Sequence, residues 1–126
     1  MILKTFDFDK VRLEGEEVVK ERATASFYFS ADVLLNLNKI GIKGVNDLGE
    51  ALQSGDLGKI AGIGWLAHRT ACRLKKTDLV IESVDEMSDL IDTVGIVEFA
   101  EYVGNAISEV MRVEMKQKKR AVKAKS

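Results

Sequence analysis

The sequence contains no proline in 126 residues, and only one cysteine and one histidine. Without proline, helices can run unbroken, and glycine must mark the turns instead. The single cysteine, Cys72, excludes an intramolecular disulfide and every zinc site built from several cysteines. The single histidine, His68, leaves little material for catalysis, which needs a nucleophile beside a positioned base.

Aromatic residues are also scarce, at 6% of the chain, so the core must be built largely from aliphatic side chains. No apolar run approaches the ~20 residues that a membrane-spanning helix requires. The first ten residues alternate apolar and charged side chains and lack the apolar segment of a signal peptide. With 46% hydrophobic and 31% charged residues, the composition is typical of one globular domain, which we expect in the cytoplasm.

The net charge of −1 hides an uneven distribution. Residues 112–126 contain seven of the 19 basic residues and one of the 20 acidic residues, so this segment carries +6 and residues 1–111 carry −7. A basic helix end is favoured by the helix dipole and keeps the protein soluble. The alternative is a segment that docks on an acidic partner or a phosphate backbone. Base stacking is not indicated, because no aromatic residue lies among these cations.

Residues 18–29 alternate between two faces in the pattern of a strand, and Glu14-Gly15 can turn a hairpin against 11–13. From Ser30 the period becomes helical, and Ser30 is a suitable N-cap for a helix through Ile40. A short helix then ends at Ser54-Gly55, and Asp56 caps a longer one over 57–75. Ser83 and Glu86 form a capping-box pattern before the next helix. Gly95 separates that helix from a last one, from Ile96 towards Lys119.

These patterns predict a mainly α fold: a small helical domain of about five helices with a short N-terminal β-strand or hairpin. The expected organisation is an N-terminal strand or hairpin segment over 1–29, a helical domain over 30–115, and a basic, flexible C-terminal tail over 116–126.

No constellation of residues indicates catalysis or a bound cofactor. His68 and Cys72 lie four residues apart on one helix and can touch, but a catalytic pair also needs an orienting group and an oxyanion site. The carboxylates of residues 82–92 lack the spacing of a calcium loop and suit a solvated helix face. Gly62-Ile63-Gly64 lacks the lysine of a nucleotide loop. We therefore expect no enzyme, no cofactor and no metal.

The stretch from Thr24 to Met111 resembles the tail assembly chaperones of long-tailed bacteriophages and prophages. The shared pattern is a strand leading into a helix (residues 25–37), a glycine turn with a short helix (40–52), and a Trp-containing helix opened by Gly55-Asp56-Leu57. A polar loop, the segment 83–92, Gly95 and a final amphipathic helix follow. The likeness covers about 70% of the chain, in pattern and order rather than through an invariant signature.

The resemblance implies a protein that coats the tape measure protein, keeps it soluble in the host cytoplasm, forms homo-oligomers, and is absent from the mature virion. A frameshift-extended form in that family recruits major tail tube subunits, and the A-rich codons of Lys118-Lys119 suit such a shift. The apolar helix faces would then supply a client or oligomer interface, and the lone tryptophan is either core or an anchor of it. The interface residues that we predict are Trp65, Met87, Leu90, Ile91, Phe99, Val103 and Ile107.

A second resemblance concerns residues 37–74, which are similar to paired helix–hairpin–helix DNA-binding units. In that motif a glycine hairpin brings backbone amides to a phosphate. Here Gly62 and Gly64 would form the hairpin, with Lys59 and Arg69 as nearby cations. The usual proline is Ala61 in this chain, and the surrounding body is acidic. DNA binding is therefore the alternative to the chaperone interpretation.

Overall fold

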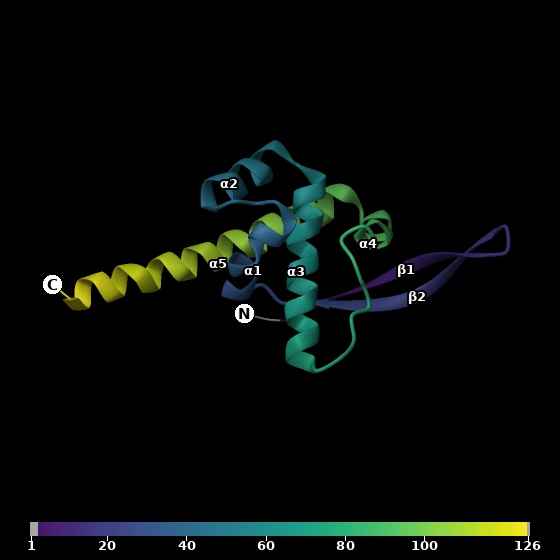
Figure 1. Ribbon diagram of the computed structural model, residues 1–126, viewed down its shortest axis with the longest axis horizontal. Helices are drawn as coiled ribbons and strands as arrows, with labels where there is room; N and C mark the ends of the chain where they lie inside the picture. The colour runs from purple at the N-terminus through teal and green to yellow at the C-terminus, as the bar shows by residue number, and fades with distance from the viewer. Residues whose placement is uncertain (1–2, 126) are drawn as a thin grey trace.

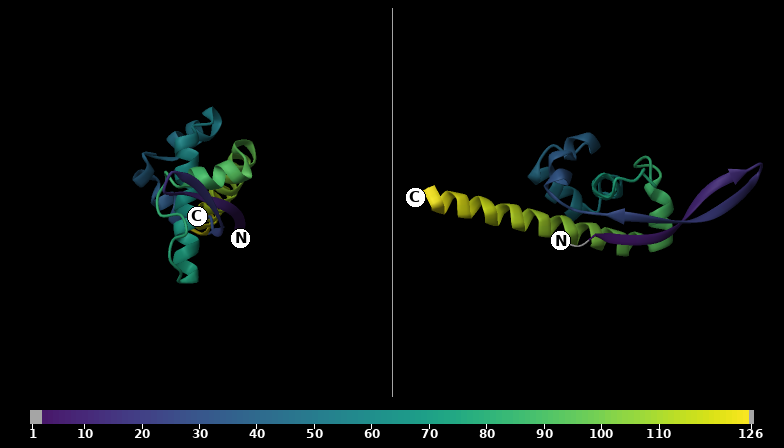
Figure 2. Two further views of the ribbon diagram at one scale, coloured as in Figure 1. Left: turned by 90° about the vertical axis from the view of Figure 1, so that its right-hand side faces the viewer. Right: turned by 90° about the horizontal axis from the view of Figure 1, so that it is seen from below.

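The computed structural model describes residues 3–125, and the side chains of residues 3–112. One long helix, α3, runs through the middle of the molecule (Figure 1). A β-hairpin extends from it to one side and the last helix, α5, extends to the other (Figure 2). In chain order the elements are β1 (Lys4–Glu14), β2 (Glu17–Phe27), α1 (Ala31–Leu35), the 3-10 helix η1 (Leu37–Ile40), α2 (Val45–Ser54), α3 (Leu57–Lys75), α4 (Met87–Val94) and α5 (Ile96–Lys125).

The predicted fold class, mainly α with a short strand or hairpin, is wrong. The fold is mixed α/β with helices in the majority, because the two strands are 11 residues long each and pair antiparallel along their whole length. Gly15, with φ of 67°, makes the turn between them. The prediction failed because 4–14 is rich in charged residues, although Phe6 and Phe8 alternate with them as in a half-buried strand.

The base of the hairpin belongs to the core of the helical part. Phe8, Ala25 and Phe27 are buried with helix residues in one cluster. The ring of Phe27 packs edge-on against Phe6 and against Tyr102 of α5. Burial raises the pKa of the Tyr102 phenol to about 12. The scarce aromatic residues are thus concentrated where the sheet meets the helices.

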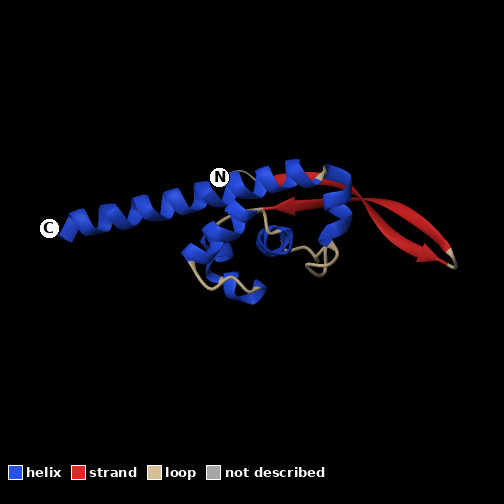
Figure 3. Ribbon diagram, turned by 90° about the horizontal axis from the view of Figure 1, so that it is seen from above, coloured by secondary structure: helices blue, strands red, loops and turns tan. Residues whose placement is uncertain are grey.

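Hydrogen bonds to α4 cover part of the outer edge of β1 midway along the hairpin. The Asp9 and Val11 amides donate to Thr93 Oγ1 and Asp89 Oδ2 of α4, each at 3.1 Å. Free strand edges invite pairing with other chains, so this cover removes two open donors from β1. The distal part of the ribbon lies clear of the helices (Figure 3).

The helix expected from Ser30 to Ile40 is divided in two. Ser30 is the N-cap as predicted, and its side chain accepts from the Asp32 amide. However, α1 ends at Leu35, because the Asn36 side chain donates to the Asp32 carbonyl at 2.7 Å and its backbone leaves the helical region. Asparagine competes for backbone hydrogen bonds in this way. A 3-10 turn then continues to Gly41, whose φ is 82°.

The helix over 57–75 is confirmed with its Asp56 cap, which accepts from the Lys59 amide. The capping box before α4 is not formed. Residues 83–86 make turns with i to i+3 bonds, α4 begins at Met87, and Glu86 accepts from the Glu82 amide rather than from Ser83. The tail over 116–126 lies outside the residues whose side chains are described.

Two glycines inside α3 allow neighbouring elements to approach it closely. A Cβ on Gly62 would lie 2.9 Å from Ile40 Cδ1, and one on Gly64 would lie 2.7 Å from Phe99 Cζ and 3.2 Å from Met87 Cε. Met87 and Phe99 are themselves buried. Glycine destabilises a helix by about 1 kcal/mol relative to alanine. Close packing therefore explains why glycine occurs at these two positions.

We expect Gly64→Ala to lower the free energy of unfolding by about 1–3 kcal/mol, because the new methyl group overpacks a filled core. Gly104→Ala is the matched control, since a Cβ there meets nothing within 4 Å. That change should raise stability by about 0.5–1 kcal/mol through helix propensity. Chemical denaturation followed by circular dichroism measures both, and equal effects of the two changes would contradict the packing explanation.

Candidate binding surfaces

His68 is fully buried and joins three parts of the chain. Its Nδ1 bonds the Ser26 carbonyl of β2 at 2.9 Å, and its Nε2 accepts from the amides of Val80 and Ile81 at 3.1 and 3.2 Å. These partners fix the neutral tautomer with hydrogen on Nδ1. Burial lowers the pKa of His68, and Lys75 lowers it further. The hydrogen bonds of His68 thus connect β2, α3 and the loop over 76–86.

Cys72 lies one turn after His68, with Sγ 3.5 Å from Nε2. The thiol is buried. Because Nε2 already accepts two amide hydrogens, it has no free lone pair with which to activate the thiol. The predicted contact between these residues exists, and the histidine is committed to backbone partners.

Trp65 is half-buried, and it also binds the loop over 76–86. Its Nε1–H donates to the Ile81 carbonyl at 3.0 Å. The guanidinium of Arg69 lies over its ring, 5.2 Å from the centroid. Trp65 therefore serves packing within the chain, and the face of its ring is occupied by Arg69.

The four residues of the DNA-binding alternative do not form a hairpin. Gly62 and Gly64 lie inside the continuous helix α3 and are buried. Lys59 is paired with Asp47 at 3.4 Å, and Arg69 lies over Trp65. Amides inside a helix are bonded to carbonyls of the preceding turn and cannot reach a phosphate. The helix–hairpin–helix geometry expected over these residues is therefore wrong.

The residues predicted as a client or oligomer interface are mostly core. Met87, Leu90, Phe99, Val103 and Ile107 are each at most 1% exposed. Trp65 and Ile91 are only partly buried and pack against the core. An amphipathic helix face has the same pattern whether it meets its own core or a partner, and here five of the seven residues meet the core.

An open apolar groove lies elsewhere, between α1, η1 and the start of α2. Its volume is about 320 Å³, and it is lined mainly by Leu34, Leu35, Leu37, Ile42 and Val45, with Lys43 beside them. Leu35 is 79% exposed and Val45 is 61% exposed. The sequence prediction missed this groove. The only sequence feature that indicated it was a third leucine, Leu35, which does not share the predicted helix face of Val33, Leu34 and Leu37.

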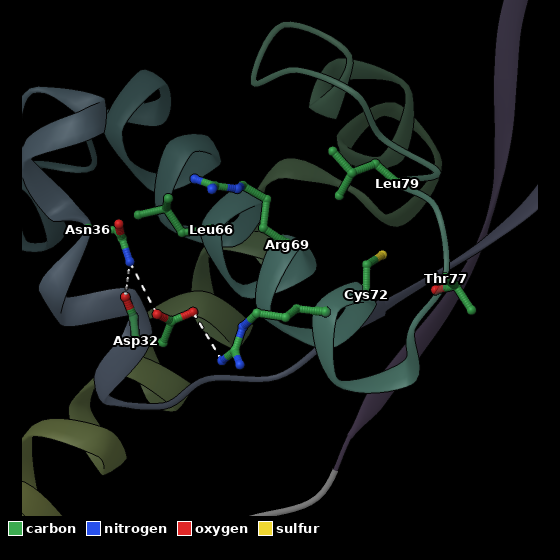
Figure 4. Close-up of a pocket in the computed structure, with 8 residues that line it drawn as sticks. Asp32, Asn36, Leu66, Arg69, Cys72, Thr77 and Leu79 are labelled. Carbon is green, nitrogen blue, oxygen red and sulfur yellow. Dashed lines mark hydrogen bonds and ion pairs between the residues drawn. The ribbon is translucent and has the colours of Figure 1, made fainter.

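A second cavity, of about 360 Å³, lies between α1, the C-terminal half of α3 and the loop after it. Asp32 and Asn36 lie on one side of it and Thr77 and Leu79 on the other, with Arg69 and Cys72 between them (Figure 4). Arg73 pairs with Asp32 at 3.5 Å, and Asp32 also accepts from the Thr70 hydroxyl at 2.8 Å. We call this the arginine cavity.

The acidic residues of 82–92 were expected to be a solvated face, and two of them have further roles. Asp89 accepts from the Val11 amide at the edge of β1, and Glu86 accepts from the Glu82 amide.

Within the described residues, no three His, Cys, Asp or Glu side chains gather in a way that would hold a metal ion. In the same part of the chain, no helix has both the length and the apolar character to cross a membrane.

Comparison of the chain with models of protein families, with curated proteins and with solved structures finds no match.

Proposed function

We propose that the protein is a tail assembly chaperone of the kind that serves long-tailed bacteriophages and prophages. It would bind and solubilise the tape measure protein in the host cytoplasm and help to recruit tail tube subunits. Its support from the sequence is the resemblance over residues 24–111. The observation that carries the proposal is the open apolar groove beside α1, which offers leucine and valine side chains to a client on an otherwise acidic body.

The occupant that we assign to the groove is the apolar face of a client helix. Such a face presents side chains at positions i, i+3, i+4 and i+7, and apolar grooves bind helices through these anchors. Three leucines, Ile42 and Val45 line the groove, and Lys43 beside them suits an acidic residue next to the client's apolar stripe. A body of charge −7 keeps the complex soluble while this apolar surface is in use.

The double variant Leu35→Glu with Val45→Glu is expected to abolish solubilisation of the client. Both side chains are more than half exposed, so the changes should leave the fold intact while placing carboxylates in the apolar groove. The measurement is the soluble fraction of the tape measure protein, co-expressed from the gene cluster that encodes this chain. Val97→Glu is the control, because Val97 is 72% exposed and does not line the groove.

Wild type and Val97→Glu should keep the client soluble, and the double variant should leave it in the pellet. A client that stays insoluble with the wild-type protein would contradict the proposed function. Equal solubilisation by the wild type and the double variant would show that the client binds elsewhere.

A further inference from the structure

The far end of the β1–β2 ribbon exposes apolar side chains. Leu13 and Val18 lie directly opposite each other, next to the turn, and are 69% and 63% exposed. The ribbon carries them away from the helices of its own chain (Figures 1 and 3). A solvent-exposed two-stranded ribbon gains little stability from its own packing. Two large apolar residues at its end are therefore unexplained by the fold of one chain.

The turn at the same end carries an electrostatic conflict. Glu14 and Glu17 are directly opposite each other in the register, and Glu16 lies between them in the turn. Like charges in directly opposed positions destabilise a strand pair. Arg12 offsets part of this through an exposed contact with Glu14 at 3.6 Å. Within the described residues, Glu16 and Glu17 have no cationic partner, so the ribbon ends in two unpaired carboxylates.

The arginine cavity offers a positive charge that complements the acidic end of the ribbon. Arg69 is half-buried over Trp65, and no carboxylate pairs with it among the described residues. A guanidinium that lies over an aromatic ring can still donate N–H hydrogen bonds to a carboxylate. Leu66 and Leu79 add apolar lining beside it. The charged lining of the cavity is Arg69, Arg73 and Asp32. Because Asp32 pairs with Arg73, Arg69 remains as a cation that can bind an acidic ribbon end.

We propose that the end of the β1–β2 ribbon of one copy docks in the arginine cavity of a second copy. The carboxylates of Glu16 and Glu17 would accept from the Arg69 guanidinium, and Leu13 and Val18 would pack against Leu66 and Leu79. The ribbon points away from its own body, so this contact forms only between copies. It relieves the repulsion between Glu14 and Glu17 and covers the exposed apolar pair at the same time.

This contact joins two different surfaces, so each copy can use its ribbon and its cavity at once. Such head-to-tail contacts produce rings or open chains rather than closed dimers. A ribbon end covers less area than a stable interface of standard size, so association should depend on concentration. Since the contact pairs charges near the surface, it should also weaken as salt is added. The inference does not rest on the chaperone function, and it leaves the apolar groove free for a client.

Charge reversal on each side tests the contact. One variant carries Glu16→Lys and Glu17→Lys on the ribbon, and the other carries Arg69→Glu in the cavity. Each variant alone should self-associate at least about tenfold more weakly than wild type, because like charges then meet. An equal mixture should recover association, since the lysine ribbon fits the glutamate cavity and the native ribbon fits the native cavity. Sedimentation velocity of the full-length chain over a concentration series measures this.

Glu50→Lys is the charge control, because Glu50 is exposed on α2 and does not line the cavity. It should associate as wild type does, and circular dichroism should show that all variants are folded. A wild-type protein that stays monomeric at every concentration would overturn the proposal. Oligomers that both variants leave unchanged, or a mixture that shows no recovery, would also overturn it. Neither result would bear on client binding at the groove, which is measured separately.

Discussion

Replacing His68 with leucine is expected to lower the free energy of unfolding by about 3–5 kcal/mol. Leucine fills a similar volume but leaves the Ser26 carbonyl and the amides of Val80 and Ile81 without their buried partner. Each unsatisfied buried group costs about 1–3 kcal/mol. Because a domain of this size has a total stability of about 5–15 kcal/mol, the variant should be close to unfolding. Urea denaturation followed by circular dichroism measures the loss.

Cys72→Ala is the neighbouring control, because it removes one buried sulfur atom next to His68 without removing a partner of the backbone. Its effect should be about 1 kcal/mol. A loss below 1 kcal/mol in His68→Leu would contradict the structural role of the imidazole.

The pH dependence of stability gives a second readout of His68. Burial and Lys75 lower its pKa in the folded protein, against the opposing effect of the Ser26 carbonyl. The unfolded chain, with a histidine pKa of ~6.5, therefore takes up the proton first as the pH falls. The stability contributed by His68 should be complete above about pH 6.5 and decline below it, by up to ~1.4 kcal/mol per pH unit. His68→Leu should lack this decline between pH 7 and 5.

Replacing Phe27 with alanine should lower the free energy of unfolding by about 3–5 kcal/mol, the usual cost of removing a buried aromatic ring. Phe27 is fully buried, and its ring lies 5.7 Å from that of Phe6 and 5.6 Å from that of His68, between centroids. This variant tests whether the hairpin is part of the core rather than an appendage. The same denaturation experiment measures it.

The control lies at the other end of the same strand. Val18→Ala removes an exposed side chain and should change stability by less than about 0.5 kcal/mol in dilute solution. If Phe27→Ala were as mild as Val18→Ala, the packing of the hairpin base against the helices would be wrong.

The sequence predicted best those elements that local residues define. Asp56 caps α3 and Lys76 ends it, and the apolar stripe between them has a helical period. The break inside 30–40 was missed because it depends on which hydrogen bond Asn36 makes, and a side-chain amide can serve either a helix or a turn. The hairpin was underestimated because only tertiary packing around Phe6 and Phe8 shows that a charged segment is a strand.

The binding surfaces were harder to predict than the helices. Periodicity identified Met87 and Leu90 on the apolar face of one helix and Phe99 on the apolar face of the next, but it does not say whether a core or a partner covers these faces. The groove needs Leu35 of α1 and Val45 of α2 on one surface, which follows from the turn at Gly41. Arg69 was predicted as a cation of the DNA-binding alternative, whereas its place over Trp65 and in a cavity depends on how α3 meets α1 and the loop.

The most direct test of the chaperone function is a titration of the isotope-labelled protein with a peptide from an apolar-striped helix of the tape measure protein, followed by amide chemical shifts. We predict that the largest shifts fall on residues 34–45, around the groove, and that they disappear in the variant with Leu35→Glu and Val45→Glu. The absence of any shift with peptides that span the client, or shifts that avoid this segment, would contradict the account.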